Sequence, residues 1–293
     1  NKVRKLDFLL ADALAQGCDT VITCGDVNSN HCRATALGAA RLGMRVILLL
    51  RGDAPDLPDG NLFLSLLAGA ETRHVAPTDY ERRDELLADA ADREQKAGRM
   101  PYVIPEGGSN ALGCFGYINA VREIRNQSEQ LGYQFTHIVT ASGSGGTQAG
   151  LMIGAHVYMP DVEVIGINVS SRNDLLHARI RQLLELWSRE FEPEIDLVAT
   201  PIRLLDEYVG PGYGKNVPED LELIRRMART QGLLLDPTYT AKAFRGLEEE
   251  VRRGTFKRGS KLLFVHTGGL HGLYPRREDL LSDLATSPPQ EAR

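Results

Sequence analysis

Runs of apolar residues alternate with longer segments of mixed polarity along most of the chain. The runs at residues 19–24 and 45–50 stand out by their apolar continuity, which is typical of strands covered on both faces. Together the runs predict strands at residues 19–24, 45–50, 71–76, 102–105, 135–140, 162–169, 202–207 and 262–265. The segments between them predict helices at residues 30–42, 80–97, 113–131, 149–155, 173–191, 218–231 and 239–253, with an amphipathic helix beginning near Leu6.

Strands that alternate with helices predict a parallel sheet covered by helices on both faces, which is an α/β fold. The helix at residues 30–42 is rich in alanine, and small residues favour close packing of a helix on a sheet. With 293 residues the chain is long enough for one large or two modest domains. The sequence has no repeat and no low-complexity linker, and we expect its tail from Ser287 onward to be disordered.

The chain carries 34 lysines and arginines against 39 acidic residues, a net charge of −5. No basic cluster is long enough to predict binding to nucleic acid or to an anionic membrane. No apolar run approaches the length of a membrane span, and no signal-peptide pattern opens the chain. The four cysteines lack the spacing of metal ligands, so we expect reduced thiols, no metal and a cytoplasmic location.

The segment Thr140–Gln148 follows the expected strand at 135–140 and precedes the expected helix at 149–155. Its glycines let several backbone N–H groups converge, and a helix N-terminus adds partial positive charge. An ordinary tight turn needs only one or two glycines, whereas residues 142–147 carry three glycines and three hydroxyl side chains. The segment therefore predicts a phosphate-binding site. Gln148 stands where a P-loop needs lysine and where the dinucleotide fingerprint needs glycine, which leaves a phosphate that only anchors its ligand.

Three further glycine-bearing junctions follow expected strands, at residues 24–30, 105–110 and 266–269. In open α/β sheets, ligands bind outside the carboxyl ends of the strands. Together with Thr140–Gln148, these loops predict one shared cleft.

Several polar side chains near these loops have more than one interpretation. Ser29 or Asn30 is a plausible helix N-cap, and either could instead present a hydroxyl or an amide at the sheet edge. His31 alone is more typical of a hydrogen-bonded structural histidine than of a catalytic base. Tyr213 stands in a glycine-rich loop, which does not favour a role in packing alone, and Tyr239 begins a helix, a position that by itself implies no function.

The first six residues, Asn-Lys-Val-Arg-Lys-Leu, resemble the Gly-Asn-Lys-x-Arg-Lys-Leu motif of the D-cysteine desulfhydrase and 1-aminocyclopropane-1-carboxylate (ACC) deaminase family. These are pyridoxal-phosphate (PLP) enzymes of the tryptophan-synthase-β fold type. Matching blocks follow in the family's order and span residues 1 to 269: residues 25–31, 107–113, 143–150, 212–214, 234–243 and 266–269.

The resemblance implies roles for individual residues. Lys2 would form the covalent imine with PLP, and Asn30 would hydrogen-bond the ring hydroxyl of the cofactor. Thr240 would face the pyridine nitrogen. The cofactor phosphate would be held by Gly143, Ser144, Gly145, Gly146 and Thr147. The substrate would contact Ser29, Asn30, His31 and Thr267, with Tyr213 and Tyr239 near the reacting atoms.

Two positions separate members of the family. The deaminases resemble one another in having glutamate at the position of Thr240 and leucine at that of Thr267. A glutamate keeps the pyridinium protonated and the ring a strong electron sink, whereas a hydroxyl leaves the nitrogen largely neutral. Prompt elimination of a good leaving group tolerates the weaker sink better than opening a cyclopropane ring does. The residues at both positions therefore favour a D-cysteine desulfhydrase over an ACC deaminase.

Two features depart from the family pattern. The family motif begins with a glycine that follows a further segment, whereas this sequence begins at the asparagine, so either it is a portion of a longer chain or the protein lacks part of its sheet. The triplet Asp26-Val27-Asn28 replaces the usual Ile-Gln before Ser-Asn, in a loop that approaches the substrate carboxylate.

From these observations we expect two domains of the tryptophan-synthase-β type, with PLP between them. The smaller would comprise residues 6–116, and the larger residues 1–5 and 117–286, with 287–293 as a tail. The expected reaction is α,β-elimination of a small amino acid to pyruvate, ammonia and sulfide, with Lys2 or Ser29 taking the α-proton. The alternatives are an ACC, cysteate or D-serine lyase and a catalytically silent PLP-binding protein. The resemblance also implies a homodimer.

Overall fold

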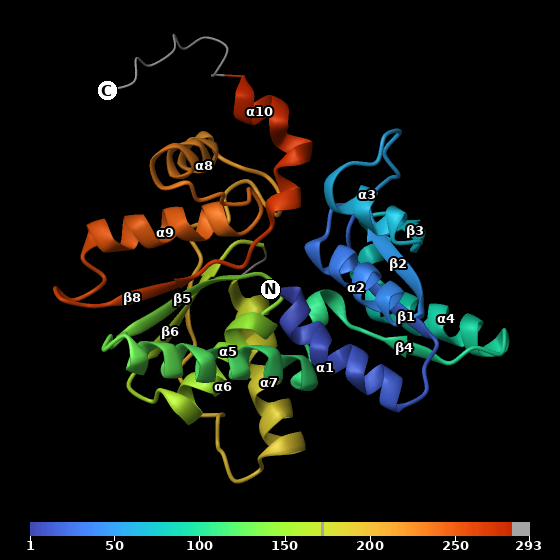
Figure 1. Cartoon of the computed structure of the whole chain (residues 1–293), viewed down its shortest axis with the longest axis horizontal. Helices are drawn as coiled ribbons and strands as arrows, with labels where there is room; N and C mark the ends of the chain where they lie inside the picture. Colours follow the sequence, from blue (N-terminus) through green and yellow to red (C-terminus); the bar gives the residue numbers. More distant parts are fainter. Residues whose placement is uncertain (171–172, 283–293) are drawn as a thin grey trace.

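The computed structural model describes residues 1–170 and 173–282, so the predicted tail at 287–293 lies outside the described residues. Two four-stranded parallel sheets form the framework, with strand orders β3-β2-β1-β4 and β7-β6-β5-β8 (Figure 1). The first sheet comprises β1 (Thr20–Asp26), β2 (Arg45–Arg51), β3 (Glu71–Val75) and β4 (Pro101–Val103). The second comprises β5 (His137–Ser142), β6 (Glu163–Asn168), β7 (Arg203–Leu205) and β8 (Leu262–Val265).

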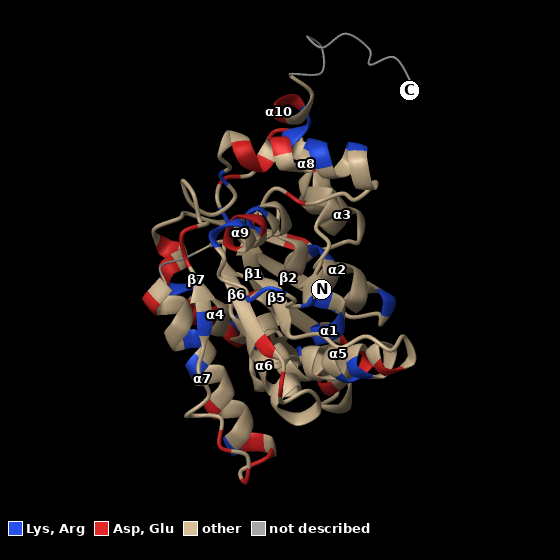
Figure 2. Cartoon of the chain, turned by 90° about the vertical axis from the view of Figure 1, so that its left-hand side faces the viewer, with Lys and Arg blue, Asp and Glu red and all other residues tan. Residues whose placement is uncertain are grey.

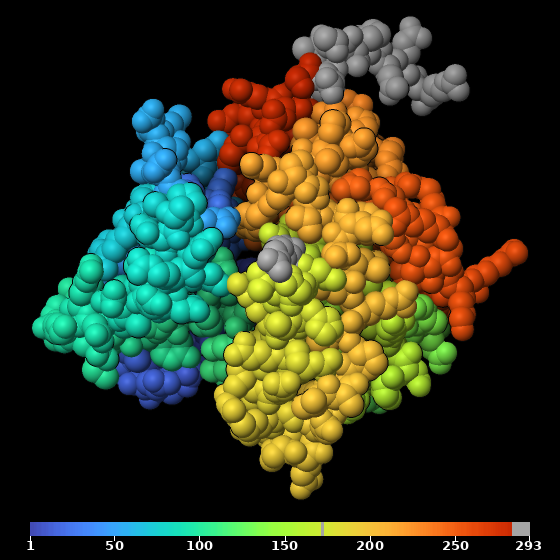
Figure 3. Space-filling model, turned by 180° about the vertical axis from the view of Figure 1, so that it is seen from behind, coloured from blue at the N-terminus to red at the C-terminus, as the bar shows by residue number. Residues whose placement is uncertain are grey.

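Helices connect the strands in the order that the sequence predicts. Those near the first sheet are α1 (Lys2–Ala15), α2 (Asn30–Arg41), α3 (Gly60–Leu67) and α4 (Arg83–Lys96). Those near the second are α5 (Ala111–Gln130), α6 (Gly146–Tyr158), α7 (Asn173–Phe191), α8 (Pro218–Gln231), α9 (Thr240–Arg253) and α10 (Arg277–Leu281). Short 3-10 turns lie at Asp79–Arg82, Glu106–Gly108, Leu270–Gly272 and Tyr274–Arg276. Figure 3, seen from behind, shows the blue-to-teal first part of the chain beside the yellow-to-red last part.

Alternate residues of the central strands enter different cores, as a pleated strand covered on both faces requires. In β1, Val21 packs with α1 and α2, whereas Ile22 packs with α4 on the opposite face. In β5, Ile138 joins the core under α5, α6 and α7, whereas Val139 packs against α9. The prediction of parallel strands covered on both faces is therefore confirmed.

The helices of the structure differ from the predicted ones at several positions. Helix α3 was not predicted, because Gly-Asn-Leu-Phe-Leu-Ser-Leu-Leu shows no clear polar face. Helix α6 begins at Gly146 rather than Ala149, because the chain turns at Gly145 with φ of +83° and the next three residues already form the first helical turn. The expected helix 80–97 is a 3-10 turn followed by α4. The predicted division between two domains at Gly116 falls inside α5 and stays a prediction.

Charged residues of both signs are interspersed over the face seen in Figure 2, as a small net charge leads one to expect. Within residues 1–170 and 173–282, we find no helix with both the length and the apolar character needed to cross a membrane.

Candidate functional site

Loops that are distant in sequence meet in one pocket of about 510 Å³ at the carboxyl ends of β1, β5 and β8. All four glycine-bearing junctions contribute to it, which confirms the predicted shared cleft. The lining residues from these junctions are Gly25, Asp26, Ser29, Glu106, Gly107, Ala141, Ser142, Gly143, Ser144, Gly145, Thr147 and Thr267. Lys2, His31, Tyr213 and Tyr239 also line it, so most of the predicted site residues are brought together.

Lys2 is the first residue of α1, and the packing of this helix against α5 and α2 brings the side chain into the pocket. Next to it, the backbone nitrogen of Asn1 lies 3.2 Å from the carbonyl oxygen of Thr267. Burial lowers the pKa of Lys2 to about 8, although the nearby carboxylate of Glu106 favours the ammonium form. About half of the amine is therefore neutral and nucleophilic at pH 8, far more than in an ordinary lysine.

Lys5, one turn further along α1, was missed in the sequence and is fully buried. Its Nζ donates to the carbonyl oxygen of Gly107 at 3.1 Å and to Oγ of Ser109 at 3.2 Å. Ser109 Oγ lies 2.8 Å from Ser144 Oγ, so this lysine is connected to the glycine-rich loop. Burial, reinforced by the charge of Lys2, lowers the pKa of Lys5 well below its usual value. Lys5 is the second lysine of the Asn-Lys-x-Arg-Lys-Leu motif, and this was the signal that could have identified it.

The glycine-rich loop leads from β5 into α6. Gly145 caps this helix without any side-chain hydrogen bond, so the first N–H groups of α6 have no capping acceptor. The buried Oγ of Ser142 also has no hydrogen-bond partner. A left-handed glycine, an uncapped helix N-terminus and nearby hydroxyls together form a site suited to an anion such as phosphate.

The loop after β1 contributes a second set of polar groups. Ser29 is the N-cap of α2, and its Oγ accepts from the N–H groups of His31 and Cys32 at 3.2 Å each. His31 Nε2 lies 2.8 Å from Thr23 Oγ1, and burial together with the charges of Lys2 and Lys5 lowers the pKa of this imidazole well below its usual value. His31 is therefore a neutral side chain at neutral pH.

Two tyrosines, Tyr213 and Tyr239, also line the pocket. The hydroxyls of Tyr213 and Tyr239 are 2.7 Å apart, and the two rings meet edge to face. Burial raises the pKa of both phenols, so each remains a proton donor at neutral pH.

Three predicted site residues do not line the pocket: Asn30, Gly146 and Thr240. Asn30 Oδ1 is buried without a hydrogen-bond partner. Gly146 lies against Lys5 and Ser109, since an added Cβ would come within 2.8 Å and 2.6 Å of their polar atoms. The Thr240 hydroxyl is engaged by Asp236, accepting from its N–H at 2.6 Å and donating to its carboxylate at 2.9 Å.

Charged and aromatic residues that the sequence analysis did not single out complete the pocket. Arg51, the last residue of β2, pairs with Asp26 at 3.0 Å, and Arg83 approaches Glu106 at 3.4 Å. The Tyr80 hydroxyl donates to Glu106 at 3.0 Å. Asp26 belongs to the triplet that departs from the family pattern. Glu106 lies in a predicted cleft loop and could have been identified from that position.

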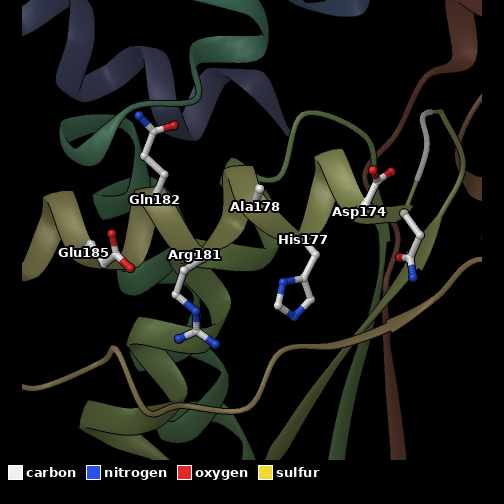
Figure 4. Close-up of a pocket in the computed structure, with 7 residues that line it drawn as sticks. Asp174, His177, Ala178, Arg181, Gln182 and Glu185 are labelled. Atoms are coloured by element: carbon white, nitrogen blue, oxygen red, sulfur yellow. The ribbon is translucent and has the colours of Figure 1, made fainter.

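A second hollow, open to solvent, runs along α7 and shares no lining residue with the central pocket (Figure 4). His177 and Arg181 point to the same side of the helix there. The guanidinium of Arg181 already donates to the carbonyl oxygens of Leu197, Val198 and Thr200. Because Arg181 already binds the backbone of the segment that follows α7, it is less available to a ligand. This hollow is therefore a weaker candidate for a functional site than the central pocket.

Comparison with known proteins gives a consistent result. A family model described as pyridoxal-phosphate dependent enzyme matches residues 1–268. A Thermotoga maritima protein, provisionally named 1-aminocyclopropane-1-carboxylate deaminase, is 43% identical over 96% of this chain and 87% of its own length. The D-cysteine desulfhydrase of Serratia proteamaculans is 40% identical over 94% of this chain and 83% of its own length. A crystal structure titled as an ACC deaminase homologue superposes with a TM-score of 0.88 at 39% identity, covering 96% of this chain and 83% of that one.

Proposed function

Because the chain belongs to the family of pyridoxal-phosphate-dependent enzymes, in the group that contains D-cysteine desulfhydrases and ACC deaminases, we propose that it is a D-cysteine desulfhydrase-like lyase. Its substrate would be a small amino acid with a good leaving group on the β-carbon. The products from D-cysteine would be pyruvate, ammonia and sulfide.

The residues of the pocket fit this cofactor. PLP needs a lysine that is neutral near physiological pH, and the pKa of Lys2 is lowered to about 8. Its phosphate needs converging N–H groups, and the N-terminus of α6 lacks a side-chain cap. Its ring hydroxyl needs a polar partner, and Asn30 Oδ1 is buried and unpartnered. A buried polar atom without a partner is costly, so this orphan supports a ligand at the site.

In the proposed site, Lys2 would hold PLP covalently, Gly143, Ser144, Gly145, Gly146 and Thr147 would hold the phosphate, and Asn30 the ring hydroxyl. When bound, PLP supplies an electron sink that stabilises negative charge at the α-carbon of an amino acid. The Lys2 amine, once free, can take the α-proton because burial keeps its pKa near the working pH.

Two other groups could move protons. Ser29 lines the pocket and is the alternative acceptor for the α-proton, although its oxygen already accepts two backbone N–H groups as a helix cap. The hydroxyl pair of Tyr213 and Tyr239 could protonate the leaving group, since each phenol keeps its proton at neutral pH. His31 and Thr267, which both line the pocket, would contact the substrate.

The observation that carries the choice of reaction is the environment of Thr240. The family resemblance implies that the residue at this position faces the pyridine nitrogen of PLP. In this chain it is a threonine whose hydroxyl forms two hydrogen bonds with Asp236. The Asp236 carboxylate also accepts from the N–H groups of Thr238, Tyr239 and Thr240 at 2.8–3.0 Å, so its acceptors are already in use. A hydroxyl in place of a free carboxylate at the position assigned to the pyridine nitrogen supports elimination of a good leaving group over the opening of a cyclopropane ring.

The alternative substrates are ACC, cysteate and D-serine. ACC stays a candidate because the chain is 43% identical to a protein provisionally named ACC deaminase. Purified protein should be supplied with PLP and each amino acid, and keto-acid products should be identified. Pyruvate and sulfide from D-cysteine support the proposal. Release of 2-oxobutyrate from ACC with no turnover of D-cysteine would reverse it.

The alternative from another functional class is a protein that binds PLP but catalyses no reaction. The visible absorbance of covalently attached PLP should appear in the native protein and be lost in Lys2→Ala. A band without turnover of any of these amino acids would favour the silent protein.

Three further proposals are independent of the substrate. We infer a homodimer from the family resemblance, which light scattering after gel filtration tests. The four cysteines are all free, which supports a cytoplasmic location that cell fractionation tests. The two-domain division, with residues 6–116 as the smaller domain, is testable by limited proteolysis and mass spectrometry of the fragments that resist cleavage.

A further inference from the structure

Tyr213 stands in a loop whose backbone cannot by itself fix the ring. Gly210, Gly212 and Gly214 all have positive φ angles, of +65°, +135° and +68°. A Cβ added to Gly212 or Gly214 would meet no atom within 4 Å, so neither glycine is packed against a neighbour. Glycines of this kind have wide conformational freedom. The position of Tyr213 must therefore be set by contacts from outside the loop.

One such contact comes from the same half of the chain. The ammonium of the fully buried Lys242 donates to the carbonyl oxygens of Val209 at 2.6 Å and Gly212 at 2.8 Å. These bonds hold the backbone that precedes Tyr213. They do not touch its ring.

The contact to the ring comes from the other sheet. Arg51 ends β2, and its guanidinium carbon lies 5.1 Å from the centre of the Tyr213 ring and 5.4 Å from that of Tyr80. Asp26, at the end of the neighbouring strand β1, holds the guanidinium through an ion pair of 3.0 Å. Strand β2 belongs to the first sheet, whereas the Tyr213 loop precedes α8 beside the second (Figure 1). One planar cation thus lies between tyrosines that come from the two halves of the chain.

We propose that Arg51, oriented by Asp26, is a positioning residue that holds the Tyr213 phenol against Tyr239 across the pocket. The proposal rests on the proposed function only in giving Tyr213 a role in the reaction. A guanidinium is suited to this position because it can stack on two aromatic faces while its edge pairs with a carboxylate. A lysine in its place would keep the charge and could pair with Asp26, but it would lose the planar stacking.

The first test measures the loop itself and needs no substrate. Amide hydrogen exchange should be followed at residues 210–214 in the PLP-loaded protein, for the native chain and for Arg51→Met. The matched control is Arg45→Met, since Arg45 begins the same strand and forms ion pairs with Glu71 and Glu94 outside the pocket. We expect exchange in the loop to rise several-fold in Arg51→Met alone. Unchanged exchange in Arg51→Met would overturn the proposal, as would an equal rise in both variants.

The second test is a double-mutant cycle on kcat/KM for the best substrate. Loss of a partly exposed cation–π contact predicts a decrease of about three- to tenfold for Arg51→Met in the native background. In the Tyr213→Leu background the same change should have less than about a twofold effect, because residues that act through each other are not additive. Arg51→Lys should recover part of the activity. Equal losses in both backgrounds would contradict a role through Tyr213.

The two tests separate this proposal from the proposed function. If no amino acid in the panel is turned over, the proposed lyase activity fails, while the exchange comparison still decides whether Arg51 positions the Tyr213 loop.

Discussion

Gly107 lies so close to Lys2 that a Cβ atom added to the glycine would be 3.2 Å from Nζ of the lysine. The same atom would be 2.5 Å from Oγ of Ser144. Gly107 also has a left-handed backbone, with φ of +69°. The space around the reactive amine therefore depends on a residue without a side chain, in a loop far from Lys2 in the sequence.

Gly107→Ala should weaken both the fold and the binding of PLP. Its matched control is Gly17→Ala, because Gly17 has a nearly identical φ of +70° and no atom within 4 Å of an added Cβ. Both variants incur a backbone cost of about 1–2 kcal/mol. Only Gly107→Ala adds crowding, of about 1–3 kcal/mol, so its Kd for PLP should rise about tenfold or more. Spectroscopic titration with PLP and thermal unfolding measure the two effects, and equal Kd values would contradict the prediction.

Covalent attachment of PLP should depend on pH through the Lys2 amine. Burial lowers the pKa of Lys2 to about 8, so this side chain loses its proton at a lower pH than an ordinary lysine. Only the neutral amine attacks an aldehyde. The initial rate should therefore rise about tenfold per pH unit below pH 8 and level off above it. Borohydride trapping followed by mass spectrometry measures this rate in apoprotein. A rate that keeps rising to pH 10 would indicate an unperturbed lysine.

Tyr239→Phe should lower kcat more than it changes KM, because the variant keeps the ring and loses the hydroxyl that lies 2.7 Å from that of Tyr213. Loss of a proton donor at the reacting atoms typically costs about 10²–10⁴ in rate. Steady-state kinetics on D-cysteine measures the effect. Tyr133→Phe is the control, because Tyr133 lies outside the pocket and packs beside Phe135. If Tyr239→Phe keeps the native kcat, the phenol of Tyr239 takes no part in the reaction.

Lys242→Met should destabilise the fold and loosen the Tyr213 loop. The change leaves the carbonyl oxygens of Val209 and Gly212 without their donor, at a cost of about 1–3 kcal/mol for each buried group that finds no new partner. Lys257→Met, at an exposed position, should change the free energy of unfolding by less than about 0.5 kcal/mol. Denaturant unfolding compares the two variants, and similar values would show that the Lys242 contacts contribute little.

Much of the fold could be predicted because its signals are local. The continuous apolar run at residues 45–50 indicates a buried strand, and β2 covers Arg45–Arg51. Glycines and hydroxyls after residue 139 indicate an anion site, and the chain turns there at Gly145 into α6. In contrast, α3 was missed because its apolar residues follow no single face. A pattern that spans a single turn or strand is formed by residues adjacent in the sequence, so the sequence alone is enough to predict that turn or strand.

The sequence by itself determined the α/β architecture, the glycine-rich loops at the strand ends and ten of the 27 residues that line the pocket. Only the tertiary structure decided that Lys5 is buried beside Gly107, that Asp236 occupies the Thr240 hydroxyl and that Arg51 reaches the Tyr213 ring. The contact between Arg51 and Tyr213 joins residues of two different sheets, so no local pattern of polar and apolar positions encodes it. Such contacts depend on how whole elements pack, because packing sets which side chains leave water together.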